Sequence, residues 1–318
     1  MNTKDAFGKA ILFGEHSAVY GRAALVAGIA GGMKLVSAAP RERGVSVRVG
    51  SWGMHESDSS QNDVGECIRI LDRLVGGGTG AELEFDTAMP PSAGLGSSAS
   101  LAVAVARAIS AVRGFALSDG EAQALAHEAE KVFHGTPSGL DDTAAAFGGV
   151  ILFRRGGWGG LDGRYDHCAR LTERAIKVSC PAQKIVIGHT GVMRSTRKMV
   201  GHVRSRREEC RQKVESMFDE IEVCLETGVD ALQQGDQRGL GKAMSRNHEV
   251  LRELGVSSPE VEEMLGIAAS AGASGGKLTG AGGGGCVIVV APGRETGVLD
   301  RWMARGYRGW ITTVEGGC

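Results

Sequence analysis

Hydrophobic and polar residues alternate with two different periods in the first 150 residues of the chain. Residues 81–85 alternate with a period of two, as a half-buried strand does, whereas residues 101–112 are rich in Ala and Val, as a buried helix is. The same patterns predict strands at 7–13, 25–37, 45–49, 81–85 and 149–153, and helices at 64–74, 98–112 and 119–133. This order of elements predicts an α+β domain.

A glycine-rich segment, 156–160, interrupts the periodic pattern and predicts a boundary, so we expect domains at 1–160 and 161–318. The second domain is predicted to hold a strand at 184–188, several helices between 195 and 271, and strands at 286–290 and 310–314. Apolar residues recur at helical spacing within 194–225. These residues are Met199, Val203, Cys210, Val214, Met217 and Ile221. The basic run 204–207 is therefore expected on the solvated face of a helix.

Composition limits the classes of partner and the compartment. The chain has 318 residues, of which 42% are hydrophobic, which is enough for two domains sharing a cleft. Its formal net charge of -1 does not favour a nucleic acid or an anionic membrane as partner. Seven cysteines without a CxxC pair argue against a disulfide framework and a zinc site, and they favour reduced thiols in the cytoplasm. No apolar run approaches the ~20 residues of a spanning helix, and Asp5 and Lys9 interrupt any signal peptide.

A loop rich in glycine and serine, 90–99, joins the predicted strand 81–85 to the predicted helix 98–112. Unpaired backbone N–H groups and the macrodipole at a helix N-terminus favour a phosphate, and Gly94 and Gly96 allow its close approach. The alternative is a plain turn with Ser97 as the helix N-cap. Because Ser98 follows directly, one hydroxyl can cap the helix while the other faces a ligand or Mg²⁺. The loop lacks the Lys of a Walker motif.

Two further segments combine polar groups with a predicted strand or turn. Lys9 lies in a predicted strand that ends at Gly14-Glu15-His16; it is either a site residue or an edge-strand lysine. Asp141 follows a turn and is either the N-cap of a short helix, 141–147, or a carboxylate that orients or deprotonates a hydroxyl.

Glu130 lies near the C-terminus of the helix that starts at 119, off its apolar face. It either pairs with His134, is simply exposed, or has a cation beside it.

The last glycine-rich segment, 277–286, formally matches the GxGxxG dinucleotide pattern. That pattern must follow a strand and open a helix, whereas here the predicted strand 286–290 comes after the glycines. We therefore expect a second glycine loop that folds over a phosphate or a substrate.

Together, five segments resemble the GHMP kinases, and within that family the members that phosphorylate mevalonate. They are GEHSAVYG (14–21), PPSAGLGSSA (90–99), EKVFHGTPSGLD (130–141), RST (194–196) and KLTGAGGGGC (277–286). The residues after Glu15-His16 differ from the acidic and aromatic pattern of galactokinases. The resemblance implies a ribosomal-S5-like N-terminal domain, a ferredoxin-like C-terminal domain, ATP and Mg²⁺ as cofactors, transfer to the C5 hydroxyl of mevalonate, and a homodimer as a plausible assembly.

The resemblance also implies a role for each matching residue. Asp141 would accept the proton of the acceptor hydroxyl, Lys9 would stabilise the alkoxide and the transferring phosphoryl group, and Ser98 and Glu130 would hold Mg²⁺. Residues implied for the nucleotide are Pro91, Ser92, Ala93, Gly94, Leu95, Gly96, Ser97, Ser98 and Ser138. Residues implied for the acceptor are Glu15, His16, Arg194, Thr196, Thr279, Gly280 and Ala281. Whether Asp141 is the base, or only orients a hydroxyl that Lys9 activates, is open.

Two positions depart from the family pattern. Ser92 replaces a frequent Gly, which is expected to affect nucleotide affinity, and Asp142 replaces a frequent Asn, where a second carboxylate can raise the apparent pKa of the site. Direct metal binding by Asp142 is the less favoured alternative.

Two other functions are considered: another GHMP kinase, acting on a phosphomevalonate-like acid or a sugar, and a catalytically silent paralogue that binds a nucleotide or metabolite. Lys9, Ser98, Glu130 and Asp141 together favour an enzyme, because a pure binder needs no base.

Overall fold

The computed structural model describes residues 5–91, 93–158, 165, 168–192 and 195–316. Backbone contacts divide the chain into two compact units. Unit 1 consists of the residues up to Lys9 together with Gly28–Gly148, and unit 2 consists of Ala10–Ala27 together with the residues from Gly149 onward. A short N-terminal segment thus groups with the C-terminal half, which no local pattern indicated. The domain boundary after residue 160 stays a prediction.

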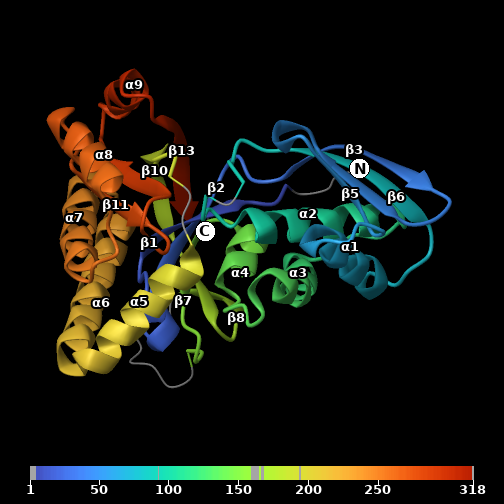
Figure 1. The fold of residues 1–318 in the computed structure, drawn as a ribbon, viewed down its shortest axis with the longest axis horizontal. Helices are drawn as coiled ribbons and strands as arrows, with labels where there is room; N and C mark the ends of the chain where they lie inside the picture. Colours follow the sequence, from blue (N-terminus) through green and yellow to red (C-terminus); the bar gives the residue numbers. More distant parts are fainter. Residues whose placement is uncertain (1–4, 92, 159–164, 166–167, 193–194, 317–318) are drawn as a thin grey trace. The chain divides into compact units, whose positions relative to one another are not determined.

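Unit 1 contains a four-stranded sheet covered by helices (Figure 1). Its strands, in sheet order, are β3 (Lys34–Arg41), β6 (Gly80–Asp86), β4 (Val45–Val49) and β5 (Met54–Ser57). Its helices are α1 (Asp63–Leu74), α2 (Ser97–Val112), α3 (Asp119–His134) and α4 (Leu140–Phe147). Helices α1 and α2 contact the sheet, while α3 contacts both of them and α4. Helix α2 is therefore buried along most of its length, as its Ala- and Val-rich sequence predicted.

The single strand predicted at 25–37 is wrong. The chain forms β2 (Ala24–Ile29) and β3, with a turn between them in which Gly31 has a φ of 87°. A Cβ on Gly32 would lie 2.1 Å from the Ala6 carbonyl oxygen, so this turn needs glycine for a close backbone approach. Apolar residues stand on both sides of this turn, so the strand pattern looks continuous, and Gly31-Gly32 is its signal in the sequence.

Unit 2 contains an antiparallel sheet in the order β11 (Gly275–Thr279), β12 (Cys286–Val290), β10 (Cys180–His189) and β13 (Arg308–Gly316). Its helices are α5 (Thr196–Glu209), α6 (Arg211–Gln234), α7 (Gln237–Glu253), α8 (Pro259–Ser270) and α9 (Glu295–Ala304). The core packs Val186 of the sheet with Phe218, Met264 and Trp302 of the helices. A further sheet runs in the order β1 (Gly8–Phe13), β2, β7 (Val150–Phe153), β9 (Ala175–Val178) and β8 (Ala169–Thr172).

The apolar residues that recur at helical spacing across 194–225 belong to two helices, and the basic run 204–207 lies on the first of them, α5. Cys210 has φ -134° and ψ 55°, outside the helical region, and it separates α5 from α6. Val203 on α5 and Val214 on α6 are buried, whereas Cys210 is exposed. The described cysteines are free thiols, and among the described residues no helix is long and apolar enough to cross a membrane.

Candidate active site

The glycine and serine loop ends in a glycine cap rather than a serine cap. Gly96 is the N-cap of α2 with a φ of 72°, Ser97 is the first helical residue, and no side chain caps this end. The alternative in which Ser97 caps the helix is therefore wrong. A Cβ on Gly96 would lie 2.8 Å from Lys9 Cγ, so glycine leaves room for Lys9 beside the start of α2. Ser92 lies outside the described residues.

Lys9 and Asp141 meet close to this loop. Lys9 is 6% exposed, and its backbone N–H donates to the Leu95 carbonyl oxygen at 2.8 Å. Its Nζ lies 3.3 Å from Asp141 Oδ1, whose side chain keeps 32% of its surface exposed. The N-cap of α4 is Gly139, so the alternative of Asp141 as N-cap is wrong. The pair thus combines a buried cation with a carboxylate that solvent can still reach.

Glu130 is buried in α3, not exposed on its surface, so the exposed alternative is wrong. Its side chain is 1% exposed, and its Oε2 lies 3.5 Å from His134 Nε2. Burial and then the charge of Asp141 raise its pKa to about 8, while a hydrogen bond from Ser98 lowers it. Among the described residues, nothing hydrogen-bonds to Glu130 Oε1. A buried carboxylate oxygen without a partner, beside a serine hydroxyl, suits a hard cation such as Mg²⁺.

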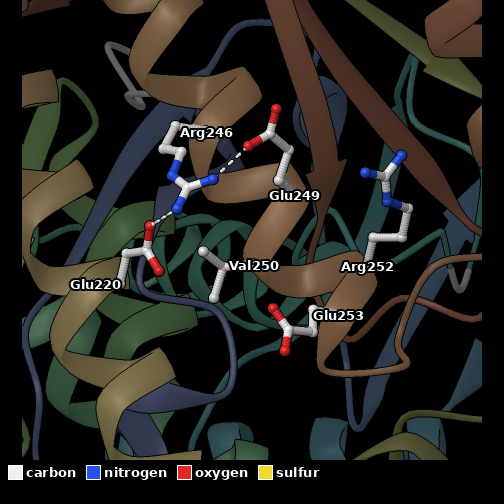
Figure 2. Close-up of a pocket in the computed structure, with 6 residues that line it drawn as sticks. All are labelled: Glu220, Arg246, Glu249, Val250, Arg252 and Glu253. Atoms are coloured by element: carbon white, nitrogen blue, oxygen red, sulfur yellow. Dashed lines mark hydrogen bonds and ion pairs between the residues drawn. The ribbon is translucent and has the colours of Figure 1, made fainter.

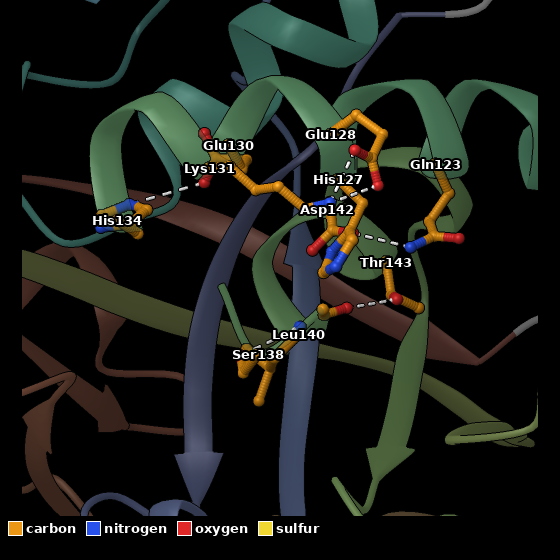
Figure 3. Close-up of polar contacts among 11 residues, drawn as sticks. Gln123, His127, Glu128, Glu130, Lys131, His134, Ser138, Leu140, Asp142 and Thr143 are labelled. Carbon is orange, nitrogen blue, oxygen red and sulfur yellow. Dashed lines mark hydrogen bonds and ion pairs between the residues drawn. The ribbon is translucent and has the colours of Figure 1, made fainter. Parts of the chain in front are cut away.

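Asp142 faces α3 (Figure 3). Its carboxylate is 1% exposed, and its Oδ2 accepts hydrogen bonds from Gln123 Nε2 at 2.6 Å and from His127 Nδ1 at 3.0 Å. Burial raises the pKa of Asp142, and the hydrogen bond from Gln123 and the proximity of His127 lower it. These two bonds tie the first turn of α4, which carries Asp141, to α3.

Removal of this tie is expected to cost stability and turnover. Asp142→Ala leaves Gln123 and His127 without their acceptor, so the free energy of unfolding should fall by about 1–3 kcal/mol. Asp142→Asn should cost less, because its amide oxygen still accepts hydrogen bonds. Urea unfolding and steady-state kinetics of both variants measure this. Equal stability of Asp142→Ala and the wild type would contradict it.

In unit 2, the segment after β1 approaches strand β11. Gly14 has a φ of 99°, and a Cβ there would lie 2.6 Å from Ala24 Cα. Glu15 is buried and pairs through Oε1 with Lys277 Nζ, and His16 Nε2 donates to the Ala281 carbonyl oxygen at 2.9 Å. The structure thus brings the predicted acceptor residues Glu15, His16 and Ala281 together.

Other predicted acceptor residues are placed differently. The Thr279 hydroxyl donates to the Ile11 carbonyl oxygen at 3.0 Å and accepts from the Ile11 N–H at 2.9 Å, so it binds backbone. Thr196 is exposed at the start of α5, and Arg194 lies outside the described residues. Lys277 was not predicted as a site residue. Its signal in the sequence is a charged residue inside an otherwise uncharged strand.

A pocket between α6 and α7 lies apart from the predicted site residues (Figure 2). Its lining residues are Glu220, Arg246, Glu249, Val250, Arg252 and Glu253. Arg246 bridges Glu220 and Glu249, so opposite charges already satisfy one another. None of the predicted site residues lines this pocket. We therefore interpret it as a solvated ion-pair groove.

Comparison with known proteins identifies the family. Residues 62–149 match the GHMP kinases N terminal domain, and residues 229–308 match the GHMP kinases C terminal domain. A mevalonate kinase of Thermococcus gammatolerans is 33% identical over 96% of this chain and 94% of its own. This chain belongs to the GHMP kinase family. This GHMP kinase is also 33% identical to a mevalonate kinase of Aeropyrum pernix, over 88% of this chain and 86% of the relative.

Solved structures confirm the two-domain α+β fold. Mevalonate kinase of L. major in complex with R-mevalonate superposes with a TM-score of 0.82 at 28% identity, over 98% of this GHMP kinase and 95% of that chain. Phosphomevalonate kinase of Streptococcus pneumoniae, at 18% identity with a TM-score of 0.76 over 99% and 100% of the two chains, shares the fold alone. Membership of the family makes this protein an ATP-dependent small-molecule kinase.

Proposed function

We propose that this GHMP kinase transfers the γ-phosphoryl group of ATP to the C5 hydroxyl of mevalonate. The observation that carries the proposal is the Lys9–Asp141 pair, 3.3 Å apart beside the glycine-capped start of α2. The identity of the acceptor is supported by full-length relatives that are mevalonate kinases, and by the L. major enzyme that binds R-mevalonate.

Lys9 and Asp141 divide the chemistry at the acceptor oxygen. Asp141 accepts the hydroxyl proton as the oxygen attacks phosphorus, a role for which its accessible carboxylate is suited. Lys9 stabilises negative charge on the oxygen and on the phosphoryl group. Because Lys9 is buried, water screens that charge less than it would at the surface. Positioned proton transfer of this kind contributes about 10²–10⁴-fold to a rate.

The start of α2 and the buried Glu130 serve the triphosphate side. The first N–H groups of α2 have no partner within the helix, and the helix dipole makes this end positive, so phosphate oxygens are suited to it. Residues 91–98 and Ser138 are proposed to surround the nucleotide. Glu130 and Ser98 would hold Mg²⁺, which neutralises charge on the transferred phosphate when it is bound. The Glu130 carboxylate must be ionised for this role.

Acceptor recognition is assigned to the residues that the family pattern implies in unit 2. They are Glu15, His16, Arg194, Thr196, Thr279, Gly280 and Ala281. For Glu15, whose side chain is buried against Lys277, and for Thr279, whose hydroxyl is bonded to Ile11, the role in acceptor recognition is indirect. A homodimer and a cytoplasmic location, which the free thiols favour, remain predictions.

A panel of acceptors tests the proposal. Release of ADP is measured with mevalonate, phosphomevalonate and galactose at equal concentration, and product formation is followed by mass spectrometry. Mevalonate is expected to give a kcat/KM at least about tenfold above the others, because unpaired polar groups penalise a wrong acceptor. Phosphorylation of phosphomevalonate or galactose without phosphorylation of mevalonate would exclude the proposed acceptor. The absence of any acceptor-dependent ADP release would favour a silent paralogue.

A further inference from the structure

One face of β11 and of the loop after it contacts the segment 11–16 at three successive points. Side chains two residues apart in a strand lie on the same face, which places Lys277 and Thr279 in one row, and Ala281 follows in the loop after β11. Lys277 contacts Glu15, Thr279 bonds both backbone polar groups of Ile11, and the Ala281 carbonyl oxygen accepts from His16. Residues 277–281 therefore hold the segment 11–16 by an ion pair, by hydrogen bonds of the Thr279 hydroxyl and by a hydrogen bond to a backbone carbonyl oxygen.

The Lys277–Glu15 pair is a buried ion pair. Both side chains are 0% exposed, and Lys277 Nζ also donates to the Leu278 carbonyl oxygen at 2.7 Å. Burial lowers the pKa of Lys277, and the charge of Glu15 opposes that change. Desolvation makes such a pair a weak source of net stability, although loss of one partner leaves the other buried and uncompensated. Stability alone is therefore a poor reason for this pair.

His16, the residue after Glu15, has an unusual backbone conformation. It has φ 61° and ψ -42°, a backbone conformation that is rare for a residue with a Cβ. Its ring is oriented by the hydrogen bond to the Ala281 carbonyl oxygen, for which Nε2 must carry the proton. The preceding residue, Glu15, is held by Lys277. Contacts at Glu15 and at His16 therefore hold the two residues on either side of the peptide bond that leads into the strained conformation.

We propose that Lys277 is a positioning residue for acceptor binding: through Glu15 it holds the strained turn that aims His16. Lys277 does not touch the acceptor, since its side chain is fully buried against Glu15 and Leu278. This inference rests on the proposed function, in which Glu15 and His16 belong to the acceptor side. A displacement of about 1 Å in such a group can cost about 100-fold in rate.

The test is a double-mutant cycle with Lys277→Met, Glu15→Gln and the double variant. Each single variant is expected to unfold at lower urea and to raise the KM for the acceptor about tenfold or more, with the KM for ATP unchanged. The double variant should recover most of the lost stability, because no uncompensated charge remains. Its acceptor KM should stay raised, since the tie between Lys277 and Glu15 is gone.

Lys213 and Glu253 provide a matched control. Lys213 Nζ lies 2.9 Å from Glu253 Oε1, but the two side chains are 58% and 56% exposed. The same substitutions there should change neither stability nor KM. Recovery of both stability and acceptor KM in the double variant would overturn the positioning role. An unchanged acceptor KM in Glu15→Gln would overturn it too. This second measurement still tests the positioning role if Lys277→Met does not fold. Failure of the proposed function is distinguishable, because wild-type activity on mevalonate is measured first and the variants are then assayed with whichever acceptor is used.

Discussion

Asp141→Asn is expected to lower kcat for the acceptor by about 10²–10⁴-fold, with little change in the KM for ATP. The amide is nearly isosteric with the carboxylate, but it cannot take a proton, and it leaves the buried Lys9 cation without its anion. ADP release at saturating ATP and acceptor measures the loss. Asp300→Asn, on the exposed surface of α9, is the matched control and should retain wild-type activity.

A comparison of this variant with Lys9→Met distinguishes a base from an orienting group. If Asp141 removes the proton, Asp141→Asn should lose more of kcat than Lys9→Met does. If Lys9 activates the hydroxyl and Asp141 only orients it, Lys9→Met should carry the greater loss. A wild-type rate in Asp141→Asn would remove the base assignment altogether.

Glu130→Gln is expected to make the metal-free protein more stable at alkaline pH and to raise the Mg²⁺ concentration needed for half-maximal activity. In the wild type, the pKa of the Glu130 carboxyl is raised from 4.5 to about 8, so the folded state keeps a proton that the unfolded state loses. The stabilisation is complete below pH 4.5 and is lost as the pH rises through 8. The shift corresponds to at most about 5 kcal/mol in the free energy of unfolding. Glutamine stays neutral and avoids this loss.

Thermal unfolding in EDTA at pH 5 and pH 9, with and without added Mg²⁺, measures the effect. The wild type should lose more stability between the two pH values than Glu130→Gln, and Mg²⁺ should restore stability to the wild type at pH 9. Glu128→Gln, an exposed position on the same helix that pairs with Lys131, should behave as the wild type does. Unchanged metal dependence in Glu130→Gln would return this carboxylate to a structural role.

Much of the fold could be predicted from local sequence, because local interactions decide those parts. The Ser118–Glu121 capping box starts α3 at Asp119, and strand β4 occupies the predicted residues 45–49. Five motifs in order also identified the family. The reversal at Gly31 and the break at Cys210 were missed, since apolar residues continue on both sides of each break.

The sequence by itself determined the α+β class and the family of the chain, because motifs and periodicity are properties of neighbouring residues. Only the tertiary structure decided which groups are buried and what they pair with. Glu130 lies inside its unit and Lys277 meets Glu15 across 262 positions of chain. Burial sets the cost of a charge, and contacts between distant segments set its partner. Neither quantity has a local signature, and so the alkaline pKa of Glu130 and the role of Lys277 emerge only from the fold.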